Sequence, residues 1–237
     1  IGGRVITKRP PYWVYNRWEN QLLLSIHNLN RQTVDEFVEK IRIFKPVFIQ
    51  GHPSGITYIA ERMLETKQQA VVKAIMTTGE TLTDDQRILI EEAFRCRVFD
   101  FYGQGEGLFF AFNCENGSGY HESSEFGIIE LQPTDSEHSL CSVIGTSLHN
   151  YAMPMLRYET GDLAEPANQS QCSCGRNLPI KLKRIIGRID DRIYLSAKSY
   201  DYILPVTIRM HIKPLLRIGQ NYQLYQLDLN QFTFSLV

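Results

Sequence analysis

The sequence predicts an α/β protein: a parallel βαβ sheet, followed by a β-rich subdomain and a small, incomplete α+β C-terminal lobe. Short apolar runs alternate with amphipathic helical patterns over residues 33–107. Short β-like runs between turn residues replace this pattern over 108–190, and one helix with two strands is expected in 191–237. We therefore expect a large domain at 1–190, built from the first two parts, and a partial lobe at 191–237.

The composition limits the classes of partner. The chain has 237 residues, of which 43% are apolar, and a net charge of −1. Because the charge is balanced and no apolar run approaches the roughly 18 residues of a transmembrane helix, we expect no nucleic-acid or membrane partner. The chain has five cysteines, an odd number, and two of them lie in a C-S-C-G sequence that suits metal better than a disulfide scaffold. We therefore expect a reducing, cytoplasmic setting. The chain starts at Ile1 without a signal peptide, so its natural start is expected upstream.

An aromatic segment precedes the βαβ part. Pro10 and Pro11 disfavour a helix there. The aromatic side chains that follow are expected to cover the core, and a binding face is the alternative. These side chains are Tyr12, Trp13, Tyr15 and Trp18.

Three amphipathic helices are expected in the βαβ part. The first starts at Thr33, which would form a capping box with Glu36. The second fits residues 56–66, and the third has Thr83 as its N-cap. The apolar face of the third helix is expected to comprise Ile88, Leu89 and Ala93.

Each of the three expected strands, 47–49, 71–76 and 97–101, ends in a small polar loop that contains glycine. Because ligands of parallel sheets sit at the carboxyl ends of the strands, these loops are expected to form the floor of a nucleotide or acyl-substrate pocket. His52, in the first loop, is a candidate for contact with substrate. The alternative for the third loop is a tight turn after a buried strand. The loops are G-H-P-S-G at 51–55, T-T-G-E at 77–80 and Y-G-Q-G-E-G at 102–107.

The rest of the chain is expected to be mainly β-structure. The β-rich subdomain has strand-like runs at 126–131, 142–146 and 155–158. The C-terminal lobe has a helical pattern at 205–216 and strand patterns at 222–228 and 232–237.

Four motifs follow one another along the chain: T-T-G-E at 77–80, Y-G-Q-G-E at 102–106, Y-E-T-G-D at 158–162 and G-R-I-D-D at 187–191. Together they resemble the adenylate-forming (acyl-AMP) superfamily. The most similar branch is that of the phenylacetate–CoA ligase-like proteins, which includes CapK-type proteins associated with capsule biosynthesis. The stretches 111–121 and 145–162 are especially similar to that branch. The order and spacing of the motifs make the resemblance specific.

The resemblance implies a nucleotide site. Tyr102 would stack against adenine, Asp162 would bind the ribose hydroxyls, and Arg188 would reach the ribose or the phosphates. Glu106 would be the catalytic residue that faces Mg²⁺, and Asp190 would be the hinge of the small lobe. The other implied nucleotide-binding residues are Gly79, Glu80, Gly103 and Gln104.

The resemblance also implies an activity, an ATP-dependent ligase that activates a carboxylic acid as acyl-AMP and transfers the acyl group to CoA. Catalysis of this kind is mostly positioning and charge neutralisation. Two alternatives stay open: transfer to an amine or a sugar, which the CapK likeness favours, and a non-catalytic nucleotide-binding relative. The implied partner is a small carboxylic acid, and a homodimer stays open as the assembly.

The chain departs from the superfamily pattern at Gly105, where Thr or Ser usually precedes the motif glutamate. The phosphate loop expected upstream and the lysine expected late in the small lobe are also absent. Both would lie outside a fragment cut at each end. We therefore expect the chain alone to be inactive in adenylation.

Four residues suggest a metal site. Cys172 and Cys174 lie in a C-S-C-G sequence, and Cys114 and His121 lie earlier in a turn-rich segment. Three thiolates and an imidazole form a tetrahedral Zn²⁺ ligand set, and similar patterns recur in the phenylacetate–CoA ligase-like branch. We expect a structural zinc that joins the loop after Y-G-Q-G-E to the loop before G-R-I-D-D. The alternative is three unrelated buried cysteines and a surface histidine.

Overall fold

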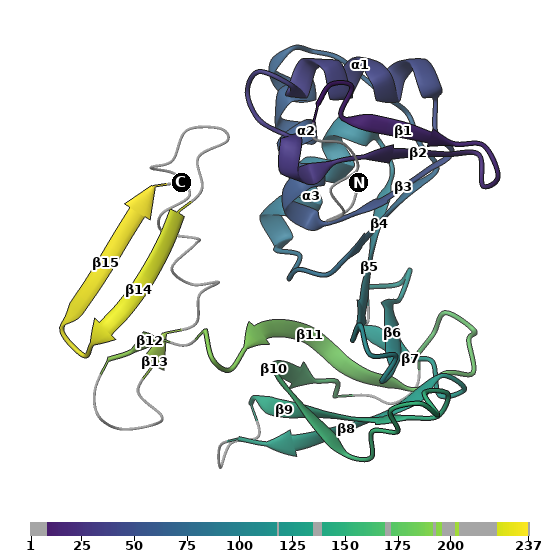
Figure 1. Ribbon diagram of the computed structural model, residues 1–237. Helices are drawn as coiled ribbons and strands as arrows, with labels where there is room; N and C mark the ends of the chain where they lie inside the picture. The colour runs from purple at the N-terminus through teal and green to yellow at the C-terminus, as the bar shows by residue number, and fades with distance from the viewer. Residues whose placement is uncertain are drawn as a thin grey trace. The chain divides into compact units, whose positions relative to one another are not determined.

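The chain forms two compact units, residues 1–101 and 102–237. The computed structural model describes residues 9–117, 119–134, 139–168, 172–191, 193–195, 202–203 and 222–236. Each unit has its own apolar core. The predicted α/β class is confirmed, because the first unit holds parallel βαβ units and the second holds antiparallel strands (Figure 1). The predicted domain boundary at residue 190 stays a prediction.

The described part of the first unit combines three parallel strands, three α-helices and an N-terminal hairpin (Figure 1). Strands β3, β4 and β5 lie side by side in that order. Helix α1 contacts α2, and α2 contacts α3. The elements are β1 (Trp13–Asn16), β2 (Gln21–Leu24), a 3-10 turn at Ile26–Asn28, α1 (Val34–Phe44), β3 (Phe48–Gly51), α2 (Pro53–Glu65), β4 (Ala74–Thr78), α3 (Asp84–Phe94) and β5 (Arg97–Gly103).

Helix α1 shows why these residues form a core. Its four buried side chains recur at the spacing of one helix face, and each fully buried large apolar side chain contributes roughly 1.5–3 kcal/mol. They are Val34, Phe37, Val38 and Ile41. Tyr12 and Trp13 pack against the same core, as predicted, whereas Trp18 is 98% exposed. None of the helices in the described ranges is both long and apolar enough to cross a membrane.

The two predicted N-caps differ. Thr83 forms a capping box: its hydroxyl oxygen accepts from the Gln86 N–H, and the Gln86 side chain accepts from the Thr83 N–H. The capping box predicted for Thr33 and Glu36 is wrong, because Thr33 makes no side-chain cap bond to α1. Its hydroxyl donates instead to the carbonyl oxygen of Asn28. A local side-chain bond to the preceding turn has replaced the cap.

Several predicted boundaries and faces also shift. The apolar face of α3 was predicted to include Ile88, but Ile88 is 64% exposed and Ile90 is fully buried in its place. Packing against the sheet decides this face, and the run of three aliphatic residues at 88–90 leaves it open in the sequence. Strand β4 begins at Ala74, later than predicted. The predicted strand at 155–158 is wrong except for Tyr158, where β10 begins.

The described part of the second unit is built mainly from antiparallel strands, in the order β6-β7-β11-β10-β9-β8. The predicted strands at 126–131, 142–146 and 222–228 correspond to β8, β9 and β14. The predicted helix at 205–216 lies outside the described residues. The strands are β6 (Phe110–Asn113), β7 (Tyr120–Glu122), β8 (Gly127–Pro133), β9 (Cys141–Ser147), β10 (Tyr158–Pro166), β11 (Ile180–Arg188), β12 (Ile193–Tyr194), β13 (Tyr202–Ile203), β14 (Tyr222–Asp228) and β15 (Gln231–Leu236).

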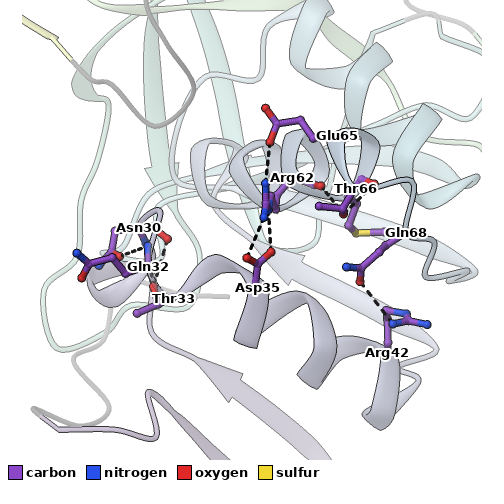
Figure 2. A network of polar contacts seen from close by, with 10 residues as sticks. Asn30, Gln32, Thr33, Asp35, Arg42, Arg62, Glu65, Thr66 and Gln68 are labelled. Atoms are coloured by element: carbon purple, nitrogen blue, oxygen red, sulfur yellow. Dashed lines mark hydrogen bonds and ion pairs between the residues drawn. The ribbon is translucent and has the colours of Figure 1, made fainter.

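A polar network joins α1 to α2 in the first unit (Figure 2). Arg62 Nε lies 2.7 Å from Asp35 Oδ1, and Arg62 Nη2 lies 2.9 Å from Asp35 Oδ2. The hydrogen bond from Arg62 holds the pKa of the Asp35 carboxyl below its usual value. This contact therefore stabilises the ionised form of Asp35.

Replacing Asp35 with asparagine is expected to lower the melting temperature by about 2 °C or less near neutral pH, because exposed ion pairs contribute little. The folded-state pKa of Asp35 is depressed, so its contribution is present above the unfolded-state pKa and is lost as the pH falls through the folded-state pKa. Melting curves measured from neutral to acidic pH should therefore converge for the two proteins. Glu36→Gln is the control, since Glu36 lies in the same first helical turn. An equal loss in that variant would attribute the effect to the helix terminus and contradict the role of Arg62.

Candidate nucleotide and metal sites

In the first unit, two of the predicted strand-end loops are held together by side chains. His52 Nδ1 lies 3.1 Å from the carbonyl oxygen of Thr78. Ser54 donates from its backbone N–H and from its hydroxyl to the two carboxylate oxygens of Glu80, each at 2.9 Å. Both oxygens of Glu80, one of the predicted nucleotide-binding residues, are thus used to join the loop after β4 to the start of α2.

Gly79 lies between these two contacts and requires glycine for two reasons. Its φ of +83° is in the left-handed region. A Cβ atom at this position would lie 2.7 Å from Cε1 and Nδ1 of His52. The imidazole ring therefore packs directly against the backbone of the T-T-G-E loop.

Replacing Gly79 with alanine is expected to destabilise the first unit by about 1–3 kcal/mol, because strain at φ and the clash with His52 add. Gly105→Ala is the matched control: a Cβ there would meet no atom within 4 Å, and its stability should change by less than about 0.5 kcal/mol. Urea unfolding of both variants measures the difference. Equal stability of the two variants would contradict the packing of His52 on Gly79.

In the second unit, the structure gathers three of the predicted nucleotide-binding residues around the carboxylate of a fourth, Asp162. Asp162 Oδ2 accepts hydrogen bonds from the Tyr102 hydroxyl at 2.8 Å and from Gln104 Nε2 at 2.7 Å. Its other oxygen, Oδ1, lies 3.7 Å from Arg188 Nε. Asp162 is buried, whereas Arg188 is about half exposed. The Asp162 carboxylate is thus a buried anion, and it faces the partly solvent-exposed guanidinium of Arg188.

Strand register explains why Asp162 and Arg188 meet. They are opposite partners in the antiparallel pair of β10 and β11, so their side chains leave the same face. Gly161, at φ +74°, leaves room for the guanidinium: a Cβ there would lie 3.3 Å from Arg188 Nη2. The Ile189 N–H donates to the Gly161 carbonyl oxygen at 2.7 Å and extends the pairing. The motifs Y-E-T-G-D and G-R-I-D-D therefore lie next to each other, on the paired strands β10 and β11 and the turn that follows β11.

Tyr102 is held at both ends. Its ring packs against Phe109, with the ring centroids 5.2 Å apart, and its hydroxyl donates to Asp162. Burial, and then the neighbouring Asp162 charge, raise the pKa of the Tyr102 hydroxyl, so it stays a hydrogen-bond donor throughout the physiological range. The Tyr102 hydroxyl thus fixes the orientation of the Asp162 carboxylate before any ligand arrives.

The remaining predicted residues of the second unit lie outside this cluster. The Glu106 side chain is exposed, and its carboxylate makes no hydrogen bond or ion pair within the described part of the chain. The backbone carbonyl oxygen of Glu106 accepts from Asn150 Nδ2 at 2.7 Å. A Cβ at Gly103 would lie 2.9 Å from the Phe109 carbonyl oxygen, which keeps that position small. Asp190 is exposed, in the turn that follows β11.

Sequence reasoning missed two residues that hold the predicted loops. Ser54 anchors Glu80 across 26 residues, and Asn150 anchors the Glu106 turn across 44 residues. Ser54 lies in the first turn of α2 and Asn150 in an irregular segment, and no periodic pattern indicates a distant partner for either. Each lies within or beside a stretch singled out for its composition, G-H-P-S-G or 145–162, and that was the only available signal.

The four predicted metal ligands also come together in the second unit. Cys114 Sγ lies 3.2 Å from Cys172 Sγ, and Cys174 Sγ lies 3.3 Å from His121 Nε2. All four donor atoms lie within 4.8 Å of one another. Cys114 and His121 are buried, and Cys172 and Cys174 are half-buried. Three sulfurs and one imidazole nitrogen at this separation can surround one tetrahedral cation.

The surroundings of the cysteine–histidine cluster orient its donors. His121 Nδ1 lies 3.1 Å from the Leu178 carbonyl oxygen, which can only accept, so Nδ1 carries the proton and the lone pair of Nε2 faces the sulfurs. The Asn116 N–H donates to Cys114 Sγ at 3.3 Å. Burial raises the pKa of the Cys114 thiol to about 11, so a bound cation would have to displace its proton.

Comparison with known proteins finds sequence similarity to CapK and to phenylacetate–CoA ligases. No protein-family model matches it. It is 29% identical to the protein CapK of Staphylococcus aureus over 244 residues, a match that covers 100% of this chain and 53% of CapK. It is 24% identical to the phenylacetate-coenzyme A ligase of Thermus thermophilus, covering 78% of this chain and 43% of that ligase. The chain thus spans about half the length of the curated relatives it matches.

Solved structures share the fold at lower identity. A 2-hydroxyisobutyryl-CoA ligase, solved in the postadenylation state with R3-HIB-AMP, matches with a TM-score of 0.64 and 21% identity, over 87% of this chain and 46% of that one. A benzoate CoA ligase from Burkholderia xenovorans LB400 matches with a TM-score of 0.53 and 14% identity, over 86% and 42%. The predicted resemblance is confirmed: the chain is similar in sequence to CapK and the phenylacetate–CoA ligases, and its fold is similar to about half of an acyl-CoA ligase structure.

Proposed function

We propose that this chain supplies nucleotide-contacting residues of an ATP-dependent ligase that activates a carboxylic acid as acyl-AMP and transfers the acyl group to CoA. The arrangement around Asp162 carries the proposal. A carboxylate fixed by Tyr102 and Gln104 is suited to accept hydrogen bonds from the two hydroxyls of a ribose, and the adjacent Arg188 supplies positive charge for a phosphate.

The chemistry of the proposed reaction asks mainly for positioning. The carboxylate oxygen of the acid attacks the α-phosphorus of ATP, the bond to the bridging oxygen breaks, and pyrophosphate leaves with its electron pair. The CoA thiolate then attacks the acyl carbon, and AMP leaves. A site that holds the ribose and neutralises the phosphates would accelerate the first step without a covalent intermediate on the protein.

Two metal ions belong to the proposal. The exposed carboxylate of Glu106, which has no partner among the described residues, fits a hard divalent cation such as Mg²⁺, which prefers oxygen ligands and would neutralise phosphate charge. Cys114, His121, Cys172 and Cys174 fit a structural Zn²⁺, because a complete set of four protein ligands leaves no position for substrate. A cytoplasmic location is part of the same proposal, since all five cysteines are free thiols.

A second candidate function is transfer of the acyl group to an amine or a sugar. The match with CapK over the whole chain favours it. A third candidate, a non-catalytic nucleotide-binding relative, has support only from Gly105, which lacks the hydroxyl that usually precedes the motif glutamate. All three candidates share the nucleotide site, and the first two share the adenylation step.

ATP–pyrophosphate exchange, measured on the complete protein that carries this chain with a panel of carboxylic acids, tests the proposal. We expect exchange that depends on Mg²⁺ and on one class of acid. Adding CoA, amines or sugars afterwards then identifies the acceptor by the release of AMP. Absence of exchange with every acid, in protein that still binds AMP, would leave only the non-catalytic candidate.

A further inference from the structure

We infer that His52 is a specificity-determining residue whose Nε2 accepts a hydrogen bond from a hydroxyl or amino group on the acid. The substrate class is then a carboxylic acid that carries such a donor, in preference to a hydrocarbon acid with the same frame. This inference rests on the proposed function and concerns the first unit alone.

The hydrogen bond to Thr78 fixes the tautomer of His52. A backbone carbonyl oxygen can only accept, and His52 Nδ1 lies 3.1 Å from the Thr78 oxygen, so Nδ1 must carry the proton. In the neutral imidazole, Nε2 then holds a lone pair and is an acceptor. The Thr78 carbonyl therefore sets the kind of group that Nε2 can bind, namely a hydrogen-bond donor.

The ring is also fixed in position. Nδ1 and Cε1 pack where a side chain at residue 79 would otherwise lie, and glycine there leaves that space to the ring. The paired hydrogen bonds from Ser54 to Glu80 hold the two loops on either side together. A ring held by the Thr78 hydrogen bond and by its packing on Gly79 can present Nε2 in one direction with little loss of side-chain entropy on binding.

Nε2 belongs to a loop at the end of the sheet where a ligand is expected. The loop that carries His52 follows β3, and the loop that carries Thr78 and Gly79 follows β4, so both lie at the carboxyl ends of parallel strands. Among the residues that the structure describes, Nε2 of the half-buried His52 has no hydrogen-bond partner. A substrate that covers this acceptor without donating to it leaves a polar atom unpaired, which is a strong basis for discrimination.

Two variants separate the roles of the two ring nitrogens. His52→Asn keeps an amide donor near the position of Nδ1 and removes Nε2. His52→Gln keeps a polar atom near the position of Nε2 and removes the bond to Thr78. We expect His52→Asn to keep the wild-type melting temperature and to lose acid specificity. His52→Gln is expected to melt earlier while retaining part of the specificity.

The test compares acids in matched pairs with the complete protein that carries this chain: 2-hydroxyisobutyrate against pivalate, 4-hydroxyphenylacetate against phenylacetate, and 4-aminobenzoate against benzoate. In ATP–pyrophosphate exchange, the wild type should favour the donor-bearing acid of at least one pair by about 5- to 150-fold in kcat/KM, and His52→Asn should reduce this ratio to near one. The ¹⁵N signal of His52 Nε2 should shift on addition of that acid and not of its partner.

The results that contradict the inference also show whether the proposed function fails with it. If the wild type uses both members of every pair equally, or if His52→Asn keeps the preference, the inference fails while the proposed function stands. If no acid supports exchange and none shifts the Nε2 signal, the inference and the proposed ligase activity fail together.

Discussion

Replacing Cys114 with serine is expected to abolish the binding of one zinc ion per chain and to destabilise the second unit. The four donor atoms come from the β6–β7 turn, from β7 and from the loop before β11, and they lie within 4.8 Å of one another. Loss of an outer partner of a metal site already costs roughly 10–100-fold in affinity. Loss of a direct ligand should cost more, because it also removes a thiolate charge.

The effect should be visible without any assay of activity. Metal analysis of purified protein is expected to give about one zinc per chain for the wild type and none for Cys114→Ser, and chelation of the wild type should lower its melting temperature towards that of the variant. Cys96→Ser is the matched control: the same chemical change at a half-buried cysteine of the first unit, which should leave the zinc content unchanged. Zinc-free wild-type protein of undiminished stability would overturn the structural zinc.

Replacing Asp162 with asparagine is expected to weaken AMP binding by about 10- to 150-fold, which corresponds to the loss of one charge-assisted hydrogen bond. Oδ2 already receives two donors, from Tyr102 and Gln104, and Oδ1 faces the Arg188 guanidinium. An amide at this position must turn its NH₂ group towards one of these donors, whichever way it is oriented. The variant therefore loses the negative charge and also disturbs the local hydrogen bonding.

Titration calorimetry with AMP and thermal unfolding, both on the complete protein, distinguish binding from folding. Glu159→Gln is the control, since Glu159 lies on the same strand, β10, with an exposed side chain. It should bind AMP as the wild type does. If Asp162→Asn keeps the wild-type affinity for AMP, Asp162 does not contact the nucleotide, and the proposed function loses its main support.

A structural feature of this chain could be predicted from the sequence when residues close together in the chain decide it, and not when distant contacts decide it. The alternation of helical and strand patterns over 33–107 predicted the parallel strands and their helices, because these patterns are local. The cap at Thr33 and the face of α3 at Ile88 were wrong, because packing and turn contacts that a local pattern does not contain decide them. The starts of β4 and β10 were misplaced for the same reason.

In the candidate sites, the residues could likewise be predicted, but the contacts between distant loops could not. The family resemblance implied that Tyr102, Gln104, Asp162 and Arg188 serve one nucleotide site, and donor chemistry together with that resemblance indicated the four metal ligands; the structure brings each set together. The sequence could not indicate that the Tyr102 hydroxyl would be committed to Asp162, 60 residues away, or that Glu80 would be committed to Ser54. Such contacts depend on how two loops meet in space, which no residue pattern within either loop records.

The pairing of β10 with β11 has a consequence for how the protein can change over evolution. Asp162–Pro166 lies opposite the longer stretch Leu182–Arg188, and the extra length is taken up at two irregular positions. Loss of an extra residue at one of these irregular positions would change the local pairing there but would leave Asp162 and Arg188 opposite each other. Natural relatives can therefore differ in the number of residues between their Y-E-T-G-D and G-R-I-D-D motifs and still keep the same pair in contact. Such relatives are better compared by which residues face one another than by how many residues separate them in the chain.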